Sequence, residues 1–421
     1  MNLGDFKMKK SIIVIILVSI LLNLLPVKAY ADGGPEISSE AAILMNMNTG
    51  DILYQKNADE KLSPASTTKI LTAMIVIEKC KLDDVVTVGK IPLYEDGSNI
   101  ALNVGEKLTV KDLLYAMMLE SANDAASALA EHISGSKENF SKLMNEKAKS
   151  LGCKASNFVN PNGLYDDNHY TTASDLAIIT KKAMENEVFR KIVSTVTYEI
   201  PPTNKQPKPR KLYNRNKLLS YPGYKYDGIT GVKNGYTEKS KNSLVASASR
   251  GSMNLISVIL KAEHSSVYKD SKALLDYGFN NFQCEKVLSM DTAICNLNVG
   301  NINIPIYPTK DFYITSSKND KSVVYKKLVF EDDIKKINKD MNIGYVEITT
   351  KYGGKEIIPL TPQKEYSSVL YTLKYMGHST YKKVLSPAVK ALIIIAVSFL
   401  VLAITLLILS YYKKCRKRKQ A

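Results

Sequence analysis

The pattern of apolar and polar positions predicts two β-hairpins, one early in the chain and one near residue 250. The first pairs residues 41–48 with 51–56 across an Asn-Thr-Gly-Asp turn, and the second pairs 243–250 with 253–261 across an Arg-Gly-Ser turn. Short runs rich in β-branched residues, joined by turn residues of this kind, are typical of hairpins.

Between the hairpins, apolar residues recur every three to four positions, which is the period of an amphipathic helix. The segments with this pattern are 67–80, 109–119, 124–133, 137–151 and 172–187. Strands at both ends and helices between them favour one antiparallel sheet with a helical cluster against it. We therefore predict an α+β domain over residues 36–279.

The pattern changes after a last helical stretch, residues 268–277, which we expect to end at Gly278. Residues 284–381 contain short β-branched and aromatic runs, separated by turn residues at fairly even intervals. These runs include 302–307, 322–329, 345–350 and 356–360. Such spacing predicts a small all-β domain, with the boundary near residues 279–284.

Both ends of the chain carry long apolar segments. Lysines precede an apolar run at 12–25, and an Ala-Tyr-Ala tripeptide follows it, which predicts a signal peptide over residues 1–31. A retained N-terminal anchor is the alternative. Residues 391–412 hold no charge, and 22 residues at about 1.5 Å each span the roughly 30 Å core of a bilayer. The basic tail, 413–421, predicts a cytoplasmic C-terminus. We expect a single-pass cell-membrane protein whose ectodomain lies outside the cytoplasm.

The formal charge of +16 is spread unevenly along the chain. The signal segment and the tail hold +3 and +6, which leaves +7 for residues 32–390. A basic exported domain is attracted to anionic lipid headgroups or wall polymers. The charge is dispersed and no basic patch is interleaved with aromatic residues, so the sequence does not favour nucleic acid as a partner.

Cysteine and histidine spacing gives no sign of a metal site. Cys80, Cys153, Cys284 and Cys295 match neither a zinc pattern nor a disulfide framework, although a Cys284–Cys295 bridge stays open. None of the four is our candidate nucleophile.

The four histidines form no His-Glu-x-x-His pattern, and the chain has no Gly-x-Ser-x-Gly elbow for a Ser-His-Asp hydrolase. We expect no metal and no cofactor. For His169 we expect a structural role.

A first polar motif, Ser66-Thr67-Thr68-Lys69, begins an amphipathic helical pattern. Side chains three positions apart share a helix face, so Lys69 lies beside Ser66. A serine becomes a nucleophile when a base takes its proton. A lysine whose pKa is lowered by desolvation can be that base or part of the relay to it. By itself, the motif fits a helix-capping serine and a solvated lysine equally well.

A second motif, Ser121-Ala122-Asn123, lies in the break between two helical patterns. Two polar side chains two positions apart on a non-helical turn can point into one cleft. Ser121 could pass a proton between the nucleophile, its base and a leaving amine, and Asn123 offers a donor and an acceptor for a peptide amide. An ordinary interhelical turn with a capping serine is the alternative.

A third motif, Lys233-Asn234-Gly235-Tyr236-Thr237, precedes the strand predicted at 243–250. On a strand, the lysine and the glycine point to the same face. A cation beside a bare Cα lets a peptide lie alongside as an added strand, with its carboxylate held electrostatically. The alternative for this motif is a basic residue near a turn.

Together, the three motifs resemble those of the low-molecular-weight penicillin-binding proteins, which are serine-type D-alanyl-D-alanine carboxypeptidases of an S11-like peptidase family. The intervals between the motifs, 52 and 110 residues, are similar to that family's. The resemblance covers about residues 36–283 and includes the block Asn160-Pro161-Asn162-Gly163-Leu164.

This resemblance implies a penicillin-binding, β-lactamase-like fold and an acyl-enzyme on Ser66. It implies that the terminal D-Ala is removed from peptidoglycan stem pentapeptides, and that β-lactam antibiotics acylate the same serine. The backbone N–H groups of Ser66 and Tyr236 are implied as the oxyanion hole. We predict Ser66, Lys69 and Ser121 as catalytic residues and, as substrate-binding residues, Asn123, Lys233, Asn234, Gly235, Tyr236 and Thr237.

One departure from the family's motif is Asn234, where the family usually has threonine. Either side chain can donate a hydrogen bond to a substrate carboxylate.

Two other functions stay open. A β-lactamase of the same superfamily must deacylate quickly, and class A enzymes use an added carboxylate and a bound water for that step. No Glu-x-x-Leu-Asn segment occurs between Asn123 and Lys233. The other function is not enzymatic: the chain would be a wall-binding scaffold whose active site has lost its activity. Asn234 is the only residue that supports this alternative.

Overall fold

The computed structural model describes residues 34–90, 92, 95–299, 302–319, 324–330, 338–350 and 355–365. Contacts divide the described residues into two units. The first comprises the described residues within the ranges Met1–Thr292 and Lys310–Val323, and the second comprises those within Ala293–Thr309 and Val324–Ala421.

The predicted signal peptide, membrane helix and basic tail lie outside the described residues. Within the described ranges, no helix combines the length and the hydrophobicity that crossing a bilayer requires.

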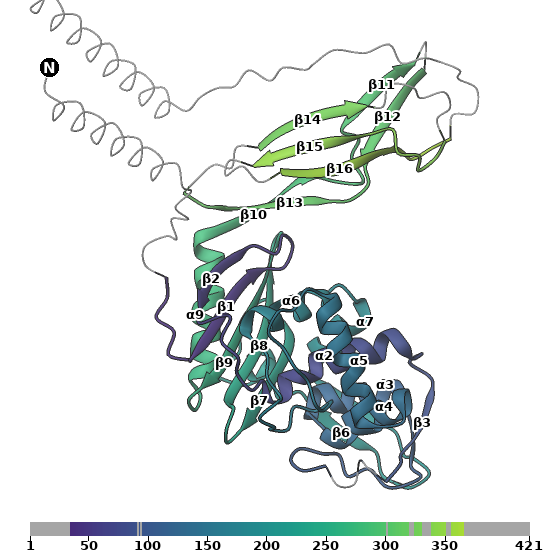
Figure 1. Cartoon of the computed structure of the whole chain (residues 1–421), viewed down its shortest axis with the longest axis vertical. Helices are drawn as coiled ribbons and strands as arrows, with labels where there is room; N and C mark the ends of the chain where they lie inside the picture. The colour runs from purple at the N-terminus through teal and green to yellow at the C-terminus, as the bar shows by residue number, and fades with distance from the viewer. Residues whose placement is uncertain are drawn as a thin grey trace, which may run out of the picture. The chain divides into compact units, whose positions relative to one another are not determined.

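The first unit is built on a five-stranded antiparallel sheet with the order β2-β1-β9-β8-β7 (Figure 1). Its strands are β1 (Ala41–Asn46), β2 (Ile52–Lys56), β7 (Ile229–Thr237), β8 (Lys241–Arg250) and β9 (Met253–Ala262). Both predicted hairpins are confirmed, as β1–β2 and β8–β9. Because β1 pairs with β9, the sheet is built from both ends of the segment, as predicted.

Helices cover both faces of this sheet, and strand β1 shows the consequence. Ala41, Ile43 and Met45 pack into the helical cluster, whereas Ala42 and Leu44 pack on the face covered by α9. Successive side chains of a strand point to opposite faces. A strand covered on both faces therefore carries a continuous apolar run instead of an alternating one.

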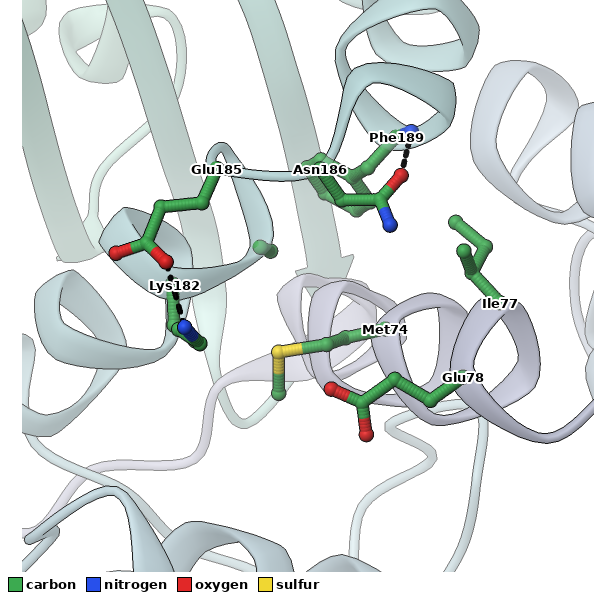
Figure 2. A pocket seen from close by; sticks show the side chains of 8 residues that line it. Met74, Ile77, Glu78, Lys182, Glu185, Asn186 and Phe189 are labelled. Carbon is green, nitrogen blue, oxygen red and sulfur yellow. Dashed lines mark hydrogen bonds and ion pairs between the residues drawn. The ribbon is translucent and has the colours of Figure 1, made fainter. Parts of the chain in front are cut away.

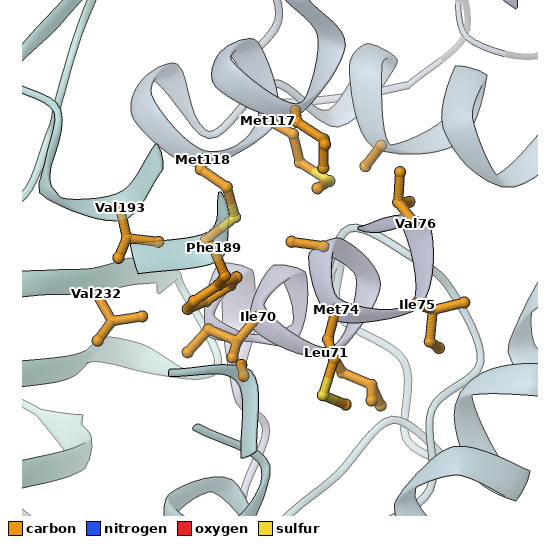
Figure 3. Close-up of a cluster of buried hydrophobic side chains, with 14 of the residues drawn as sticks. Ile70, Leu71, Met74, Ile75, Val76, Met117, Met118, Phe189, Val193 and Val232 are labelled. Carbon is orange, nitrogen blue, oxygen red and sulfur yellow. The ribbon is translucent and has the colours of Figure 1, made fainter. Parts of the chain in front are cut away.

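The helical cluster lies between the first and last strands in sequence. Its helices are η1 (Ala65–Thr68, a 3-10 turn), α2 (Lys69–Lys79), α3 (Val110–Tyr115), η3 (Ala116–Glu120, a π-helix), α4 (Asn123–Ser134), α5 (Lys137–Ser150), α6 (Ala173–Ala183) and α7 (Glu187–Ser194). The short α8 (Lys217–Ser220) packs its buried Leu218 on the opposite face of the sheet. Helix α9 (Ser266–Asn281) follows the sheet. Figure 3 shows the core around α2, where Ile70 and Met74 lie in one cluster with Phe189 of α7 and Val232 of β7.

Three small ladders complete this unit. Two of them pair β3 (Val85–Thr87) with β4 (Lys107–Thr109) and β5 (Thr197–Ile200) with β6 (Arg210–Tyr213). Strand β10 (Phe282–Leu288) pairs with β13 (Phe312–Ser317), and both group with the first unit.

The structure corrects two helix predictions. The predicted helix 172–187 is too long, because α6 ends at Ala183. A separate helix that was not predicted, α7, follows it, and Asn186 caps its start by accepting a hydrogen bond from the Phe189 N–H on its side-chain oxygen. The predicted end at Gly278 is wrong, since α9 continues to Asn281. A Cβ at Gly278 would lie 2.6 Å from Leu255 Cδ1, so this glycine allows the helix to pack closely on the sheet.

The second unit contains a five-stranded antiparallel sheet with the order β11-β12-β16-β15-β14. The strands are β11 (Cys295–Val299), β12 (Ile302–Pro308), β14 (Val324–Phe330), β15 (Gly344–Thr350) and β16 (Lys355–Pro362). The predicted all-β part is confirmed, while the exact domain limits stay predictions. Cys284 and Cys295 are both free thiols, so the bridge left open by the sequence is not formed.

Candidate active site

Ser66 lies on η1, the turn that leads directly into α2. Ala65 before it has a φ of 50°, a left-handed value that is uncommon for a residue with a Cβ. Such a conformation persists where the surrounding structure determines it. Here Gly163 packs against the Ala65 carbonyl, and a Cβ on Gly163 would overlap that oxygen. The serine is therefore presented on a turn held by close packing.

Lys69 begins α2 and is completely buried. Its Nζ lies 3.0 Å from Ser66 Oγ, 2.6 Å from Asn123 Oδ1 and 2.6 Å from the carbonyl oxygen of Asn162. A neutral amine has two N–H donors and one lone pair. The two amide carbonyls can take both donors, which leaves the lone pair to accept the Ser66 hydroxyl proton. The arrangement suits a base for Ser66.

The surroundings also favour the neutral form of Lys69. Burial holds its pKa well below the ordinary lysine value, and the nearby Lys233 cation lowers it further. Glu95 and Asp124 act in the opposite direction, because negative charge stabilises the ammonium. Lys69 is consequently available as a proton acceptor at a pH where an exposed lysine is fully charged.

The second motif lies where helix η3 meets α4. The predicted helix 109–119 ends in the π-helix, and Ser121 closes it with a left-handed φ of 64°. Asn123 starts α4, and its side-chain oxygen accepts from Lys69 Nζ. Its Nδ2 donates to the Asp96 carbonyl oxygen. Asn123 is thus part of the lysine's environment, while the buried Ser121 hydroxyl forms no hydrogen bond to Ser66 or Lys69 in the described structure.

The third motif is brought to Ser66 by strand β7, which packs against η1. A Cβ on Gly235 would lie 2.7 Å from the backbone nitrogen of Ser66, closer than ordinary packing allows. Only glycine lets the two backbones approach this closely. Strand β7 is also the last strand of its sheet, so its outer edge can pair with an extended peptide.

Lys233 is buried on β7, with 1% of its surface exposed. Its Nζ donates to the Asn234 carbonyl oxygen at 2.9 Å and to Asn234 Oδ1 at 3.3 Å. Burial lowers the pKa of Lys233 to about 7, assisted by Arg215 and opposed by Glu120. An arriving carboxylate would supply the anion that this buried amine lacks.

The last two residues of the motif differ in placement. The Tyr236 side chain is largely exposed. Thr237 Oγ1 donates to Ser240 Oγ at 2.7 Å and accepts from the Ser240 N–H, so this hydroxyl is engaged in the β7–β8 turn. The binding roles of both residues stay predictions.

Comparison with known proteins agrees with this geometry. Residues 28–264 match the peptidase S11 family, described as D-alanyl-D-alanine carboxypeptidase. The chain belongs to this family. The D-alanyl-D-alanine carboxypeptidase DacF of Bacillus subtilis is 37% identical to it, over 69% of this chain and 76% of that one.

Two solved structures of similar proteins extend the comparison. Penicillin binding protein 5 from Haemophilus influenzae is 31% identical, with a TM-score of 0.63, over 80% of this chain and 99% of that one. The Streptomyces K15 DD-transpeptidase is 34% identical, with a TM-score of 0.56, over 59% of this chain and 99% of that one. The mixed α/β penicillin-binding fold is thereby shown.

Within this family fold, the site contains two residues that were not predicted from the sequence. Asn162 supplies the carbonyl that binds Lys69, and Glu95 binds the Asn162 side chain. Asn162 lies in the Asn-Pro-Asn-Gly-Leu block already noted for its resemblance, which was a usable signal. Nothing in the sequence around Glu95 distinguishes it from a solvated carboxylate.

His169 is buried beside the first motif. Its Nδ1 accepts from the Val159 N–H, so its Nε2 carries the proton and donates to Thr68 Oγ1 at 2.9 Å. Burial lowers its pKa to about 4, which keeps the ring neutral. These contacts connect the 153–172 loop to the turn that carries Ser66. In the described part of the chain, no cluster of His, Cys, Asp or Glu residues is arranged to hold a metal.

A surface pocket of about 280 Å³ lies farther along α2 (Figure 2). It is lined by Met74, Ile77 and Glu78 together with residues of α6 and α7, and it contains none of the motif residues. A site that binds an extended peptide along a strand edge need not be a deep cavity.

Proposed function

We propose that this chain is a serine-type D-Ala-D-Ala carboxypeptidase that removes the terminal D-Ala from peptidoglycan stem pentapeptides. The observation that carries the proposal is the buried Lys69 amine, 3.0 Å from Ser66 Oγ, in a member of the S11 family. No cofactor takes part in the proposed reaction.

In the acylation step, Ser66 Oγ attacks the carbonyl carbon of the penultimate D-Ala while Lys69 Nζ takes the hydroxyl proton. The N–H groups of Ser66 and Tyr236 hold the resulting oxyanion. When the tetrahedral intermediate collapses, the C–N bond breaks and the departing D-Ala amine takes a proton through Ser121. The products are an ester on Ser66 and free D-Ala.

In the deacylation step, water adds to the ester carbonyl and gives a proton to the base that served in acylation. The ester C–O bond then breaks and the Ser66 hydroxyl is restored. A β-lactam ring would be opened by the same attack on its carbonyl. Its leaving nitrogen stays tethered to the acyl group, so the ester on Ser66 is expected to persist.

Substrate recognition is assigned to the edge of β7. The stem peptide lies along this edge as an added strand, and Gly235 lets the edge lie close to the Ser66 backbone. The terminal carboxylate lies near Lys233 and Asn234. There it accepts from the Lys233 ammonium in place of the two Asn234 oxygens that bind this ammonium in the free protein. Asn123 and Thr237 border this path.

Mass spectrometry distinguishes this function from its rivals. The protein is incubated with penicillin and, separately, with a pentapeptide that ends in D-Ala-D-Ala. A long-lived adduct on Ser66 together with D-Ala release supports a carboxypeptidase. Rapid penicillin turnover would indicate a β-lactamase, and neither signal would indicate a scaffold.

We predict that Asn234→Thr keeps kcat/KM on a D-Ala-D-Ala peptide within about tenfold of the wild type, a difference of about 1.4 kcal/mol. Both side chains can donate a hydrogen bond to a carboxylate, and the threonine hydroxyl is more firmly fixed at χ1. Asn234→Ala removes the donor and is expected to cost more. The measurement compares the peptide acid with its C-terminal amide. Equal losses on both substrates would show that residue 234 does not contact the carboxylate.

We further propose that residues 391–412 anchor the protein in the cell membrane, with the catalytic part outside the cytoplasm and residues 1–31 removed as a signal peptide. The uncharged segment and the basic tail support this location. We expect a chain cut near residue 380 to be released as a soluble protein that keeps its turnover of a small peptide. Loss of turnover after the cut would contradict a purely anchoring role.

A further inference from the structure

A buried carboxylate is connected to Lys69 through one residue. The Glu95 side chain is 3% exposed, and its Oε1 forms an ion pair with Lys137 Nζ of α5 at 2.7 Å. Its other oxygen accepts a hydrogen bond from Asn162 Nδ2, also at 2.7 Å. The carbonyl oxygen of Asn162 accepts from Lys69 Nζ at 2.6 Å. A continuous set of contacts therefore runs from α5 to the amine beside Ser66.

Hydrogen bonds to both polar atoms of its side-chain amide fix Asn162 in this network. Its Nδ2 donates to Glu95, and its Oδ1 accepts from the Leu164 N–H at 3.0 Å. The adjacent Pro161 carbonyl accepts from Thr72 Oγ1 of α2 at 2.6 Å. Because the side chain cannot rotate without breaking these bonds, the Asn162 carbonyl keeps its direction toward Lys69. Of the groups that hold it, only Glu95 carries a charge.

That charge acts on Lys69 together with several others. The charge of Lys233 on β7 lowers the pKa of Lys69, whereas the charges of Glu95 and of Asp124 on α4 raise it. His169 is close to Lys69 but neutral, since its pKa is about 4. Lys137 neutralises part of the Glu95 charge, because the two side chains form an ion pair.

We propose that Glu95 is a positioning residue, which holds the Asn162 carbonyl on Lys69 and, together with Lys137, balances the charge around that amine. This inference rests on the carboxypeptidase assignment and deepens it. Glu95 reaches the reaction through Asn162 and Lys69 and does not contact the substrate.

The test separates the carboxylate's charge from its hydrogen bond. Glu95→Gln keeps an oxygen that can accept from Asn162 but removes the negative charge. The rate constant of acylation by a fluorescent penicillin is measured from pH 5 to pH 10. We expect the acidic limb of this profile to move to lower pH by about one pH unit, since a neighbouring charge shifts a pKa by about that amount or more. The plateau rate is retained.

The opposite shift is expected when the counter-charge is removed. Lys137→Met leaves the Glu95 charge unbalanced, which stabilises the ammonium form of Lys69 and moves the acidic limb to higher pH. A matched control is Lys147→Met, because Lys147 also lies on α5 and pairs with a glutamate, Glu78, at 2.7 Å. Glu78 has no part in the charges around Lys69. This control is expected to leave the limb unmoved.

Glu95→Ala removes the hydrogen bond as well as the charge, so the plateau rate is expected to fall, by up to about 10²-fold, which is what a misplacement of about 1 Å can cost. Thermal unfolding shows whether each variant is folded. If Glu95→Ala does not fold, the pH profile of Glu95→Gln alone tests the proposal.

Coincident pH profiles for wild type and Glu95→Gln would overturn the proposal, as would shifts of the same sign in Glu95→Gln and Lys137→Met. A wild-type protein that is acylated by penicillin but releases no D-Ala would refute the carboxypeptidase function alone.

Discussion

Replacing Ser66 by alanine is expected to abolish both penicillin labelling and D-Ala release, a loss of about 10⁴-fold or more. Without Oγ no acyl-enzyme can form, and the remaining groups can only orient the peptide. The fold is expected to persist, because the other two Lys69 hydrogen bonds, to Asn123 and Asn162, do not involve the serine. Intact-protein mass after incubation with penicillin, together with a D-Ala release assay, gives the result.

A matched control is available three residues earlier in the chain. Ser63 lies just before η1, and its hydroxyl accepts from Ser240 Oγ at 2.6 Å. Ser63→Ala removes one hydroxyl from the same loop, so it is expected to keep labelling and turnover. A covalent adduct on another serine in the Ser66→Ala protein would show that the nucleophile is assigned wrongly.

Replacing Lys69 by methionine is expected to slow acylation by about 10²–10⁴-fold, the usual contribution of a general base. Methionine preserves the apolar stem but cannot accept a proton. Unfolding temperature must be followed in parallel, since Asn123 Oδ1 and the Asn162 carbonyl lose their donor and a buried unpaired group costs about 1–3 kcal/mol.

The pH profile shows whether Lys69 acts as a base. The neutral amine is the active form, so the wild-type rate is high above the lowered pKa of Lys69 and falls as pH decreases through it. The variant is expected to lack this acidic limb. If Lys69→Met retained the limb, another group would be the base, and if Lys69→Met acylated at the wild-type rate, no base would be needed at this position.

Much of the framework could be predicted because it depends on local pattern. The runs in β1 and β9 and the turns beside them specify hairpins through side-chain periodicity and turn residues, which neighbouring positions in the chain determine. The first motif could be located for the same reason. Ser66 and Lys69 are one helical turn apart, so their proximity follows from the helix alone.

Element boundaries were less predictable wherever a tertiary contact overrides the local signal. Gly278 has the character of a helix end, yet α9 continues to Asn281 because the missing side chain makes room for Leu255 of β9. The overlong prediction 172–187 has a local cause instead: α6 ends at Ala183, and Asn186 caps the separate helix α7 through the Phe189 N–H three residues later.

The sequence alone identified the three motifs and the candidate site residues in them, whereas the tertiary structure decided their surroundings. That β7 lies against η1, with Gly235 beside the Ser66 nitrogen, depends on packing between segments far apart in the chain. Lys69 is buried at the start of α2, and its partners lie in distant loops: the Asn162 carbonyl accepts from it, and Glu95 accepts from the Asn162 side chain. Burial and the charges of distant residues set a pKa, and neither is a property of the local sequence.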